Sequence, residues 1–143
     1  MVRQLLVAWC LMAASVAIHA YGLTLALHWL RRRASPTGQL ATVRLFIGLS
    51  GWIILLHVSE VMSWAVAYAL MDAMPDLTSG LYFSAVTYTT TGYGDLVLPA
   101  RWRLVGAVEA LTGILMCGWS TGFFFAVVSR SLETTQGDPL SKT

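Results

Sequence analysis

Three long apolar runs constrain the fold of this chain more than any other feature of its sequence. They occupy residues 5–30, 45–71 and 104–128, and few charged side chains interrupt them. A helix crosses the hydrocarbon core of a bilayer with about 20 apolar residues, so each run is long enough to span. Only 11% of the 143 residues are charged, whereas soluble domains contain roughly a quarter. We therefore predict an all-α membrane protein with three transmembrane helices and no soluble domain of useful size.

The first run has features of both a retained helix and a cleaved signal peptide. Arg3 precedes it, and Ala20 is a possible cleavage residue that would release residues 1–20. Its apolar stretch, however, continues well past the roughly 7–15 residues of a signal-peptide core. We expect a retained helix, which forms an extra N-terminal unit of residues 1–33 with the basic loop that follows and acts as a peripheral brace.

Charged residues are distributed unevenly between the two loops that join the runs. The first loop is basic, and the second is richer in acids. By the positive-inside rule the first loop is cytoplasmic, which places the N-terminus outside and a disordered tail of residues 131–143 inside. Arg130 agrees with this orientation and Arg3 opposes it. The residues compared are Arg31, Arg32, Arg33 and Arg44 in the first loop, and Asp72, Asp76, Asp95, Arg101 and Arg103 in the second.

Net charge and cysteine content exclude several other classes of protein. A net charge of +2 is too small to indicate a nucleic-acid partner. Cys10 and Cys117 both lie in apolar runs, which fits neither a disulfide framework nor a zinc site. We expect membrane lipid as a partner and no cofactor.

Residues 89–95 read Thr-Thr-Thr-Gly-Tyr-Gly-Asp, a pattern suited to binding a dehydrated cation. Backbone carbonyls replace the hydration shell of an ion when several copies of a strand point them at a shared axis. Successive carbonyls point the same way only if some residues take left-handed dihedrals, which glycines such as Gly92 and Gly94 adopt without a Cβ penalty. The Thr90 hydroxyl adds a further ring of oxygens, and the Tyr93 ring points away from the axis. A Thr/Gly-rich turn at a helix end is the alternative.

The heptapeptide is similar to the T-x-G-Y-G-D signature of the tetrameric potassium channels, and the chain looks most like the small prokaryotic members. The resemblance covers residues 42–130 and implies a homotetramer in a bacterial inner membrane that conducts K+ as its permeant ion. The ion would bind Thr90, Thr91, Gly92 and Tyr93, next to Gly94. The implied segments are an outer helix over 45–71, a re-entrant pore helix over 79–89 with Thr78 or Ser79 as its N-cap, the selectivity filter at 89–95, and an inner helix over 104–128.

The resemblance also implies roles for side chains around the filter. Tyr82 and Phe83 match an aromatic cuff around it, although interface aromatics would look the same. Four copies of Asp95 would form an acidic ring at the outer mouth, with Tyr82 as the expected hydrogen-bond partner of each.

Two positions depart from the family pattern. Val86 stands where many members have a glutamate, so a carboxyl pair behind the filter is expected to be absent. Thr91 replaces a Val or Ile, and its hydroxyl needs a partner, for which Thr87 or Glu109 would serve. Selectivity is expected to survive, because the carbonyls coordinate the ion.

The third run carries glycines and a stripe of residues at helical spacing. Gly113 matches a hinge glycine of the family, or it permits close helix packing, and Gly106, Gly118 and Gly122 are expected to serve packing. The Phe123–Phe125 run is either a hydrophobic gate or lipid-facing packing. The stripe expected to line the central cavity consists of Ile114, Cys117, Thr121 and Phe125.

Ionisable residues inside the apolar runs are functional candidates by default. His57 and Glu60 share one helix face, which we expect to pack on the pore and inner helices with Glu109 close by. This cluster would support the filter from behind and make conduction depend on pH through His57, or it would be a static hydrogen-bond network. His19 and His28 have weaker claims.

The sequence favours a potassium channel that is not an enzyme. An intramembrane enzyme built on His57, Glu60 and Glu109 and a nonconducting subunit or sensor of a larger complex are the alternatives. No span carries arginines at every third position, so no voltage sensor is indicated, and the sequence does not identify the gating stimulus.

Overall fold

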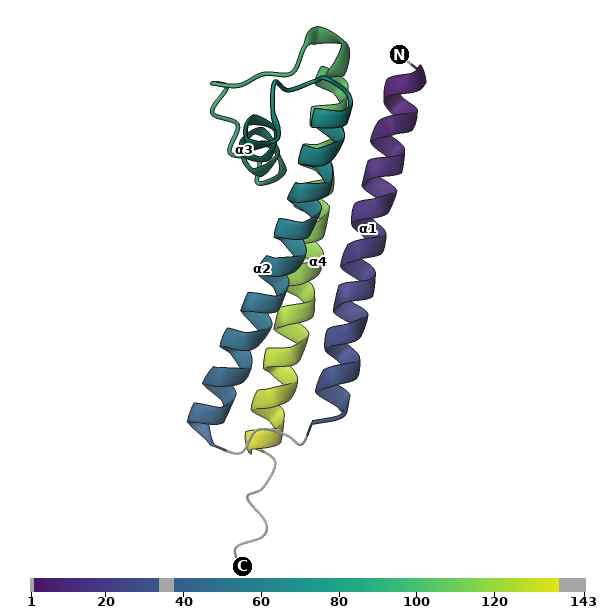
Figure 1. Cartoon of the computed structure of the whole chain (residues 1–143). Helices are drawn as coiled ribbons and strands as arrows, with labels where there is room; N and C mark the ends of the chain where they lie inside the picture. Colours follow the sequence, from purple (N-terminus) through teal and green to yellow (C-terminus); the bar gives the residue numbers. More distant parts are fainter. Residues whose placement is uncertain (1, 34–37, 137–143) are drawn as a thin grey trace, which may run out of the picture.

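Three long helices form the body of the molecule. The computed structural model describes residues 2–33 and 38–136, without the side chains of residues 132–136. The long helices are α1 (Val2–Arg31), α2 (Gln39–Leu70) and α4 (Arg103–Gln136) (Figure 1). In the sequence, the short helix α3 (Leu77–Tyr88) and the 3-10 turn η1 (Ala100–Trp102) come after α2 and before α4. The three long helices have the length and apolar composition needed to cross a membrane. The predicted all-α fold with three apolar spans is confirmed.

Several helix ends lie outside the expected bounds. α2 begins before the predicted outer helix, and α4 continues to Gln136, so the tail predicted to be disordered from residue 131 is helical over its first six positions. Residues 137–143 lie outside the described part of the chain. The short helix is capped by Asp76 and not by Thr78 or Ser79, because the Asp76 carboxylate accepts the Ser79 backbone N–H at 2.8 Å. A carboxylate at this position also suits the positive end of the helix dipole.

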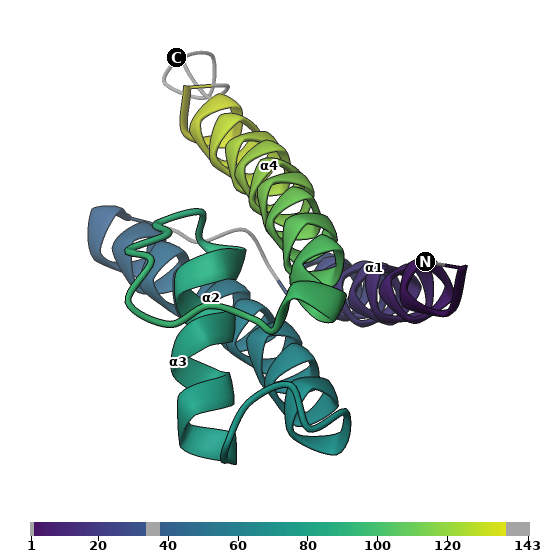
Figure 2. The same cartoon turned by 90° about the horizontal axis from the view of Figure 1, so that it is seen from above.

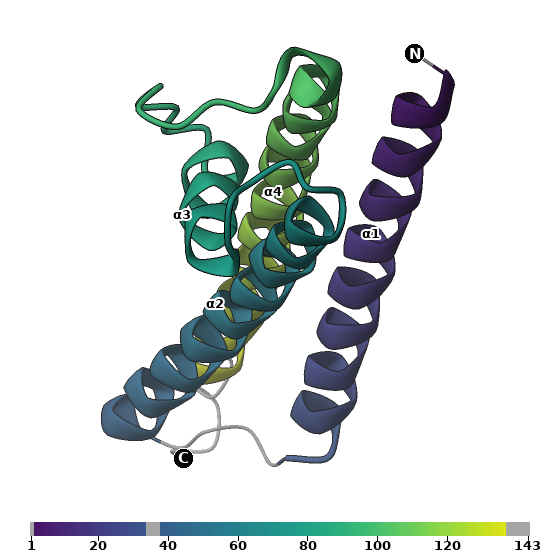
Figure 3. The same ribbon diagram turned by 45° about the horizontal axis from the view of Figure 1, so that its top comes forward.

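The helices are arranged so that α2 and α4 lie at the centre. α1 packs on α4 and α2, while α3 packs on α2 and α4 and lies away from α1 when the molecule is seen from above (Figure 2). Residues 89–95 and α3 lie at the same end of the bundle as the N-terminus, whereas α1 ends and α2 begins at the opposite end (Figure 3). Residues 89–95 and the basic residues at the end of α1 are therefore at opposite ends of the spans.

α1 is held inside the chain's own bundle by one face of small and polar residues. Gly22 permits close approach, since a Cβ there would overlap Leu56, and the Trp64 indole donates to the Ser15 hydroxyl at 3.0 Å. The expected peripheral brace is therefore integrated with α2 and α4 in the same subunit. Its buried residues are Ala8, Ser15, His19, Gly22 and Ala26.

Candidate functional site

The segment after α3 alternates between left-handed and ordinary backbone. Thr90, Gly92 and Gly94 have φ values of 60°, 57° and 78°, and the residues between them do not have positive φ. The expectation for the two glycines is confirmed. The left-handed Thr90 is a third member of the series that the sequence did not indicate.

Thr90 takes this conformation because it also ends α3. Its N–H donates to the Thr87 carbonyl at 2.9 Å, and the Thr91 N–H donates to the Val86 carbonyl at 2.9 Å. This pair of bonds, with a left-handed residue just beyond the C-cap, is a Schellman motif. Glycine usually fills that position, and a β-branched residue there stores about 1–3 kcal/mol of backbone strain. The first left-handed residue of this segment is thus fixed by the helix that precedes it.

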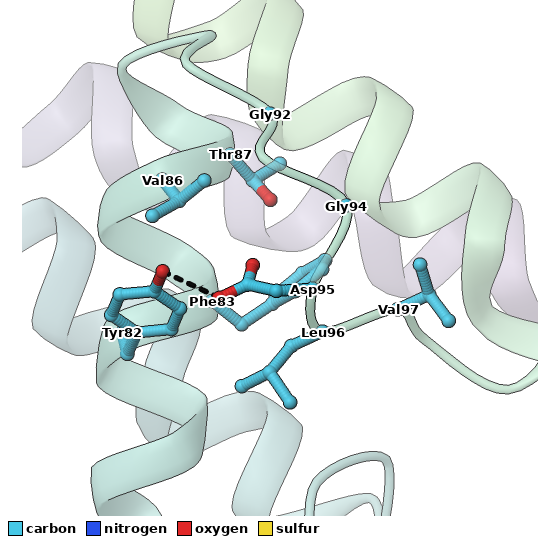
Figure 4. Close-up of a pocket in the computed structure, with 9 residues that line it drawn as sticks. All are labelled: Tyr82, Phe83, Val86, Thr87, Gly92, Gly94, Asp95, Leu96 and Val97. Carbon is cyan, nitrogen blue, oxygen red and sulfur yellow. Dashed lines mark hydrogen bonds between the residues drawn. The ribbon is translucent and has the colours of Figure 1, made fainter.

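The outer end of the segment is tied back to α3 by a side-chain hydrogen bond. The Tyr82 hydroxyl donates to the Asp95 carboxylate at 2.7 Å across a hollow of about 200 Å³ (Figure 4). The bond lowers the pKa of Asp95 below its ordinary value and raises the pKa of Tyr82. The expected pairing of these two residues is confirmed. The hollow is lined by Tyr82, Phe83, Val86, Thr87, Gly92, Gly94, Asp95, Leu96 and Val97.

Thr91 has a different partner from those expected. Its hydroxyl lies 2.9 Å from the Thr89 hydroxyl, and not against Thr87 or Glu109. Thr87 instead faces the hollow, and the Tyr93 ring is 72% exposed in the single chain. The hydroxyls of Thr89 and Thr91 are thus satisfied within or next to the segment, and its aromatic ring is left uncovered.

Glu109 reaches α3 from α4. Its buried carboxylate accepts the Tyr68 hydroxyl at 2.6 Å and the Ser84 hydroxyl, and Ser84 lies on α3. Phe83 packs edge-on against Tyr68, with ring centroids 5.3 Å apart. A carboxyl group therefore lies behind the pore helix even though Val86 replaces the expected glutamate, because α4 supplies it.

A closed ring of hydrogen bonds joins all four helices in the middle of the bundle. Glu60 bonds to His19 Nδ1 at 2.8 Å and accepts the Tyr88 hydroxyl. Tyr88 bonds to His57 Nδ1 at 3.1 Å, and His57 Nε2 and His19 Nε2 each lie 3.1 Å from the Ser120 hydroxyl. We call these five residues the polar ring. It connects α1, α2, α3 and α4 through side chains alone.

The polar ring is complete at only one proton count. Each of its five bonds needs one proton between its two heavy atoms. Five protons make the cluster neutral overall, either with a protonated Glu60 and two neutral imidazoles or with an ionised Glu60 and one imidazolium. A sixth proton, which would charge both histidines beside an ionised Glu60, leaves one bond with two protons and opens it. The arrangement is therefore sensitive to protonation by its geometry.

Sequence reasoning placed His57 and Glu60 correctly and missed His19. Their shared face meets both α3 and α4, as expected, but Glu109 bonds to Tyr68 and Ser84 and belongs to a separate cluster within the described residues. His19 is fully buried against Glu60. The signal that could have found it is the small-residue face of α1, on which it lies between Ser15 and Gly22.

Two histidines and one carboxylate of the polar ring also form a possible metal-binding group. His19, His57 and Glu60 each bring one ligand atom within 4.8 Å of the others. These donor types suit Zn²⁺, but the same atoms already bond to one another and to Tyr88 and Ser120. A metal would have to replace those hydrogen bonds.

The predicted cavity stripe lies on one exposed face of α4. Ile114, Cys117, Thr121 and Phe125 are all exposed, Phe125 at 71%. The phenylalanine run divides, because Phe124 stacks on Phe46 with centroids 5.8 Å apart while Phe125 faces outward. Only one of the three rings therefore lies on the stripe.

The glycines of α4 serve different contacts. A Cβ on Gly113 would overlap the Tyr88 carbonyl oxygen, and one on Gly106 would approach Leu98 and Phe83. Gly113 therefore lets α4 pack against the end of α3. Gly118 and Gly122 have no neighbour within 4 Å of such a Cβ, so the expected packing role is not fulfilled inside one described chain.

Comparison with known proteins places the central part of the chain. The sequence model of a family described as "Ion channel" matches residues 42–130, more than half of the chain. No curated protein and no solved structure matches it. The matched residues contain α3, the filter segment and the whole exposed stripe of α4, and they exclude α1.

Proposed function

The chain belongs to this ion channel family, and on that premise we propose that it is a potassium-selective channel that conducts K+ passively through a homotetrameric pore. The observation that carries the proposal is the positive φ at residues 90, 92 and 94. Left-handed residues at every second position turn successive carbonyls toward one side of the strand. Such a row of oxygens can replace the hydration shell of K+.

The tetramer is inferred from what one chain leaves uncovered. Residues 89–97 are all exposed, although α3, the helix that directly precedes them, packs on α2 and α4. Irregular backbone is tolerated at membrane depth only where it is buried in protein or lines a water-filled space. Further copies of the chain around an axis would supply both, with water and ions on one side of the filter and protein on the other.

Electrostatics along the proposed ion path favour cations. The C-terminal end of α3 leads directly into the filter, and the partial negative charge of a helix C-terminus stabilises a dehydrated cation there. Four copies of Asp95 would add an acidic ring at the mouth, and the exposed stripe of α4 would line the cavity below. The end of α3 and the ring of Asp95 carboxylates are thus both suited to a positive ion.

In the proposed orientation, within a bacterial inner membrane, the filter mouth and the N-terminus face the outside of the cell. The end of α4 faces the cytoplasm. This orientation rests on the basic residues near Arg31 and Arg44, which lie at the end of the bundle opposite the filter. The positive-inside rule assigns that end to the cytoplasm.

Flux measurements on the purified full chain test this function. Liposomes loaded with K+ should release it down the gradient, Ba²⁺ should block the release, and Na+ in place of K+ should abolish it. Equal Na+ and K+ flux would contradict selectivity. No flux with a folded protein would favour the nonconducting subunit, and metal-dependent hydrolysis would favour the enzyme.

A further inference from the structure

A groove opens between the three long helices at the end of the bundle opposite the filter. Its volume is about 770 Å³, and α1, α2 and α4 all contribute to its walls. Four arginines line it, and no acidic residue is among the described residues that do so. They are Arg31, Arg33, Arg44 and Arg130. The polar ring and the filter take no part in it.

The same groove has an apolar side. Leu27 and Phe123 line it one turn or more further into the spans than Arg31 and Arg130, and Leu45 lines it directly after Arg44, together with Leu30 and Val127. On α1 and α4 these residues come before the arginine in the sequence, and on α2 they come after it. Since α2 runs opposite to α1 and α4 (Figure 1), all of them lie on the membrane side of the charges. The groove is therefore amphipathic along the axis of the bundle, with positive charge at its rim.

Arginine is well matched to phosphate at such a rim. A guanidinium is planar and presents paired N–H donors that bind phosphate oxygens bidentately. The Arg33 guanidinium stacks over the Trp29 ring, 3.9 Å from its centroid, an arrangement in which the donors point outward in the plane of the group. Trp29 also lines the groove, and tryptophan is typical of the membrane interface.

We propose that this groove binds the headgroup phosphate of an anionic phospholipid, with the acyl chains lying along its apolar side. Basic pockets between transmembrane helices are suited to anionic headgroups, and a soluble phosphate would leave Leu27, Leu45 and Phe123 uncovered. Because two of the arginines precede the family-matched segment and two lie within it, the lipid would fasten α1 to α2 and α4. The inference is independent of whether the chain conducts ions.

Lipid titration of the full chain in neutral detergent, read by native mass spectrometry, tests the proposal. Phosphatidylglycerol should bind the wild type more tightly than phosphatidylcholine. The double variant Arg31→Gln/Arg44→Gln should bind phosphatidylglycerol roughly thirtyfold more weakly, because the loss of each arginine near an anionic headgroup is expected to weaken binding about fivefold. The matched control is Arg101→Gln, which removes one charge from an exposed position at the other end of the bundle and should bind like the wild type.

Three results would overturn the proposal: equal binding of the two lipids by the wild type, wild-type binding by the double variant, or an equal loss in Arg101→Gln. Displacement of phosphatidylglycerol by millimolar inorganic phosphate would also overturn it, in favour of a soluble anion. Circular dichroism checks that each variant keeps its helices. If the double variant unfolds, Arg44→Gln alone should weaken binding roughly fivefold, and Arg44→Lys, which keeps the charge but not the paired donors, should restore only part of it.

Discussion

The proposed filter segment, residues 89–95, and the polar ring are both polar features of an apolar bundle, yet only the polar ring is complete within a single chain. The polar ring closes on itself through five side chains from four helices, and His19 and Glu60 are fully buried within it. The filter segment is exposed along its length. Substitutions in the two regions should therefore have different effects: those in the polar ring should lower the stability of the chain, and those in the proposed filter should reduce ion conduction.

The largest expected effect is on conduction, from alanine at Gly92 or Gly94. A Cβ at either position meets nothing within 4 Å in one chain, so the damage comes from the positive φ and not from a clash. A left-handed L-residue costs roughly 1–2 kcal/mol, or about 4–8 kcal/mol over the four copies of the proposed tetramer. We expect K+ flux from liposomes to fall below detection while helical content and melting temperature stay near wild type.

Gly51→Ala is the matched control for the filter glycines. Gly51 lies in α2, is exposed, and also has open space around a built Cβ, but its φ is not positive. Alanine is favoured over glycine in a helix by about 1 kcal/mol, so flux should persist and stability should not fall. Loss of flux in this control, or normal flux with Gly92→Ala, would remove the backbone argument.

The next largest effect is on stability, from Glu60→Ala. The change leaves His19 and the Tyr88 hydroxyl buried without a carboxylate partner. Each buried group so stranded costs about 1–3 kcal/mol. Thermal unfolding in detergent should show a clear drop in melting temperature. Ser59→Ala, one residue away, removes only a local bond to Leu56 and should melt near wild type; equal melting of the two variants would show that the polar ring does not hold the helices together.

The contrast between the two regions also explains which features the sequence could predict. The spans and the filter glycines follow from local properties, apolar length and tolerance of positive φ, and both were predicted. The left-handed Thr90 depends on the bonds that end α3, and a threonine gives no local sign of it. His19 meets Glu60 across 41 positions of sequence, so only the packing of α1 on α2 reveals the pair.

The helix ends were less predictable for a related reason. Hydrophobicity stops at about residue 128, but helical hydrogen bonds in α4 continue to Gln136. Apolar composition reports where a helix contacts lipid or core, not where it unwinds. For the same reason Asp76, which precedes the apolar part of α3, was missed as its cap.

The proton count of the polar ring predicts an intermediate effect on pH dependence. If acid adds a sixth proton to the ring, one of its hydrogen bonds must open. A bond worth about 1 kcal/mol shifts an equilibrium about fivefold, and α3 would transmit the change from Tyr88 to the filter. Single-channel recordings between pH 8 and 5 should show a change of this order in open probability for wild type and none for His57→Gln. An identical pH response in the variant would leave the polar ring as a static network.

A smaller effect is expected at the filter mouth from Tyr82→Phe. The Tyr82 hydroxyl holds the pKa of Asp95 below its ordinary value, so the bond contributes stability above the ordinary pKa and loses it as pH falls through the lowered one. Without the hydroxyl the pKa of Asp95 rises toward its ordinary value. Protonation of the outer ring by external acid should therefore reduce K+ current at a higher pH in the variant than in wild type. A midpoint that does not move, or moves down, would show that Asp95 does not govern the entry of ions.

The smallest expected effect is that of Thr91→Val. The Thr91 hydroxyl contacts only the Thr89 hydroxyl in the described chain, an exposed bond that contributes about 1 kcal/mol or less. Valine is nearly the same size and is the residue more usual in the family pattern, while the carbonyls that would coordinate K+ are unchanged. Reversal potentials in mixed K+ and Rb+ should give the wild-type permeability ratio, and unitary current should change less than for Tyr82→Phe. A variant that admits Na+ would instead make the hydroxyl pair at Thr89 and Thr91 part of the selectivity mechanism, and the filter would then depend on side chains as the polar ring does.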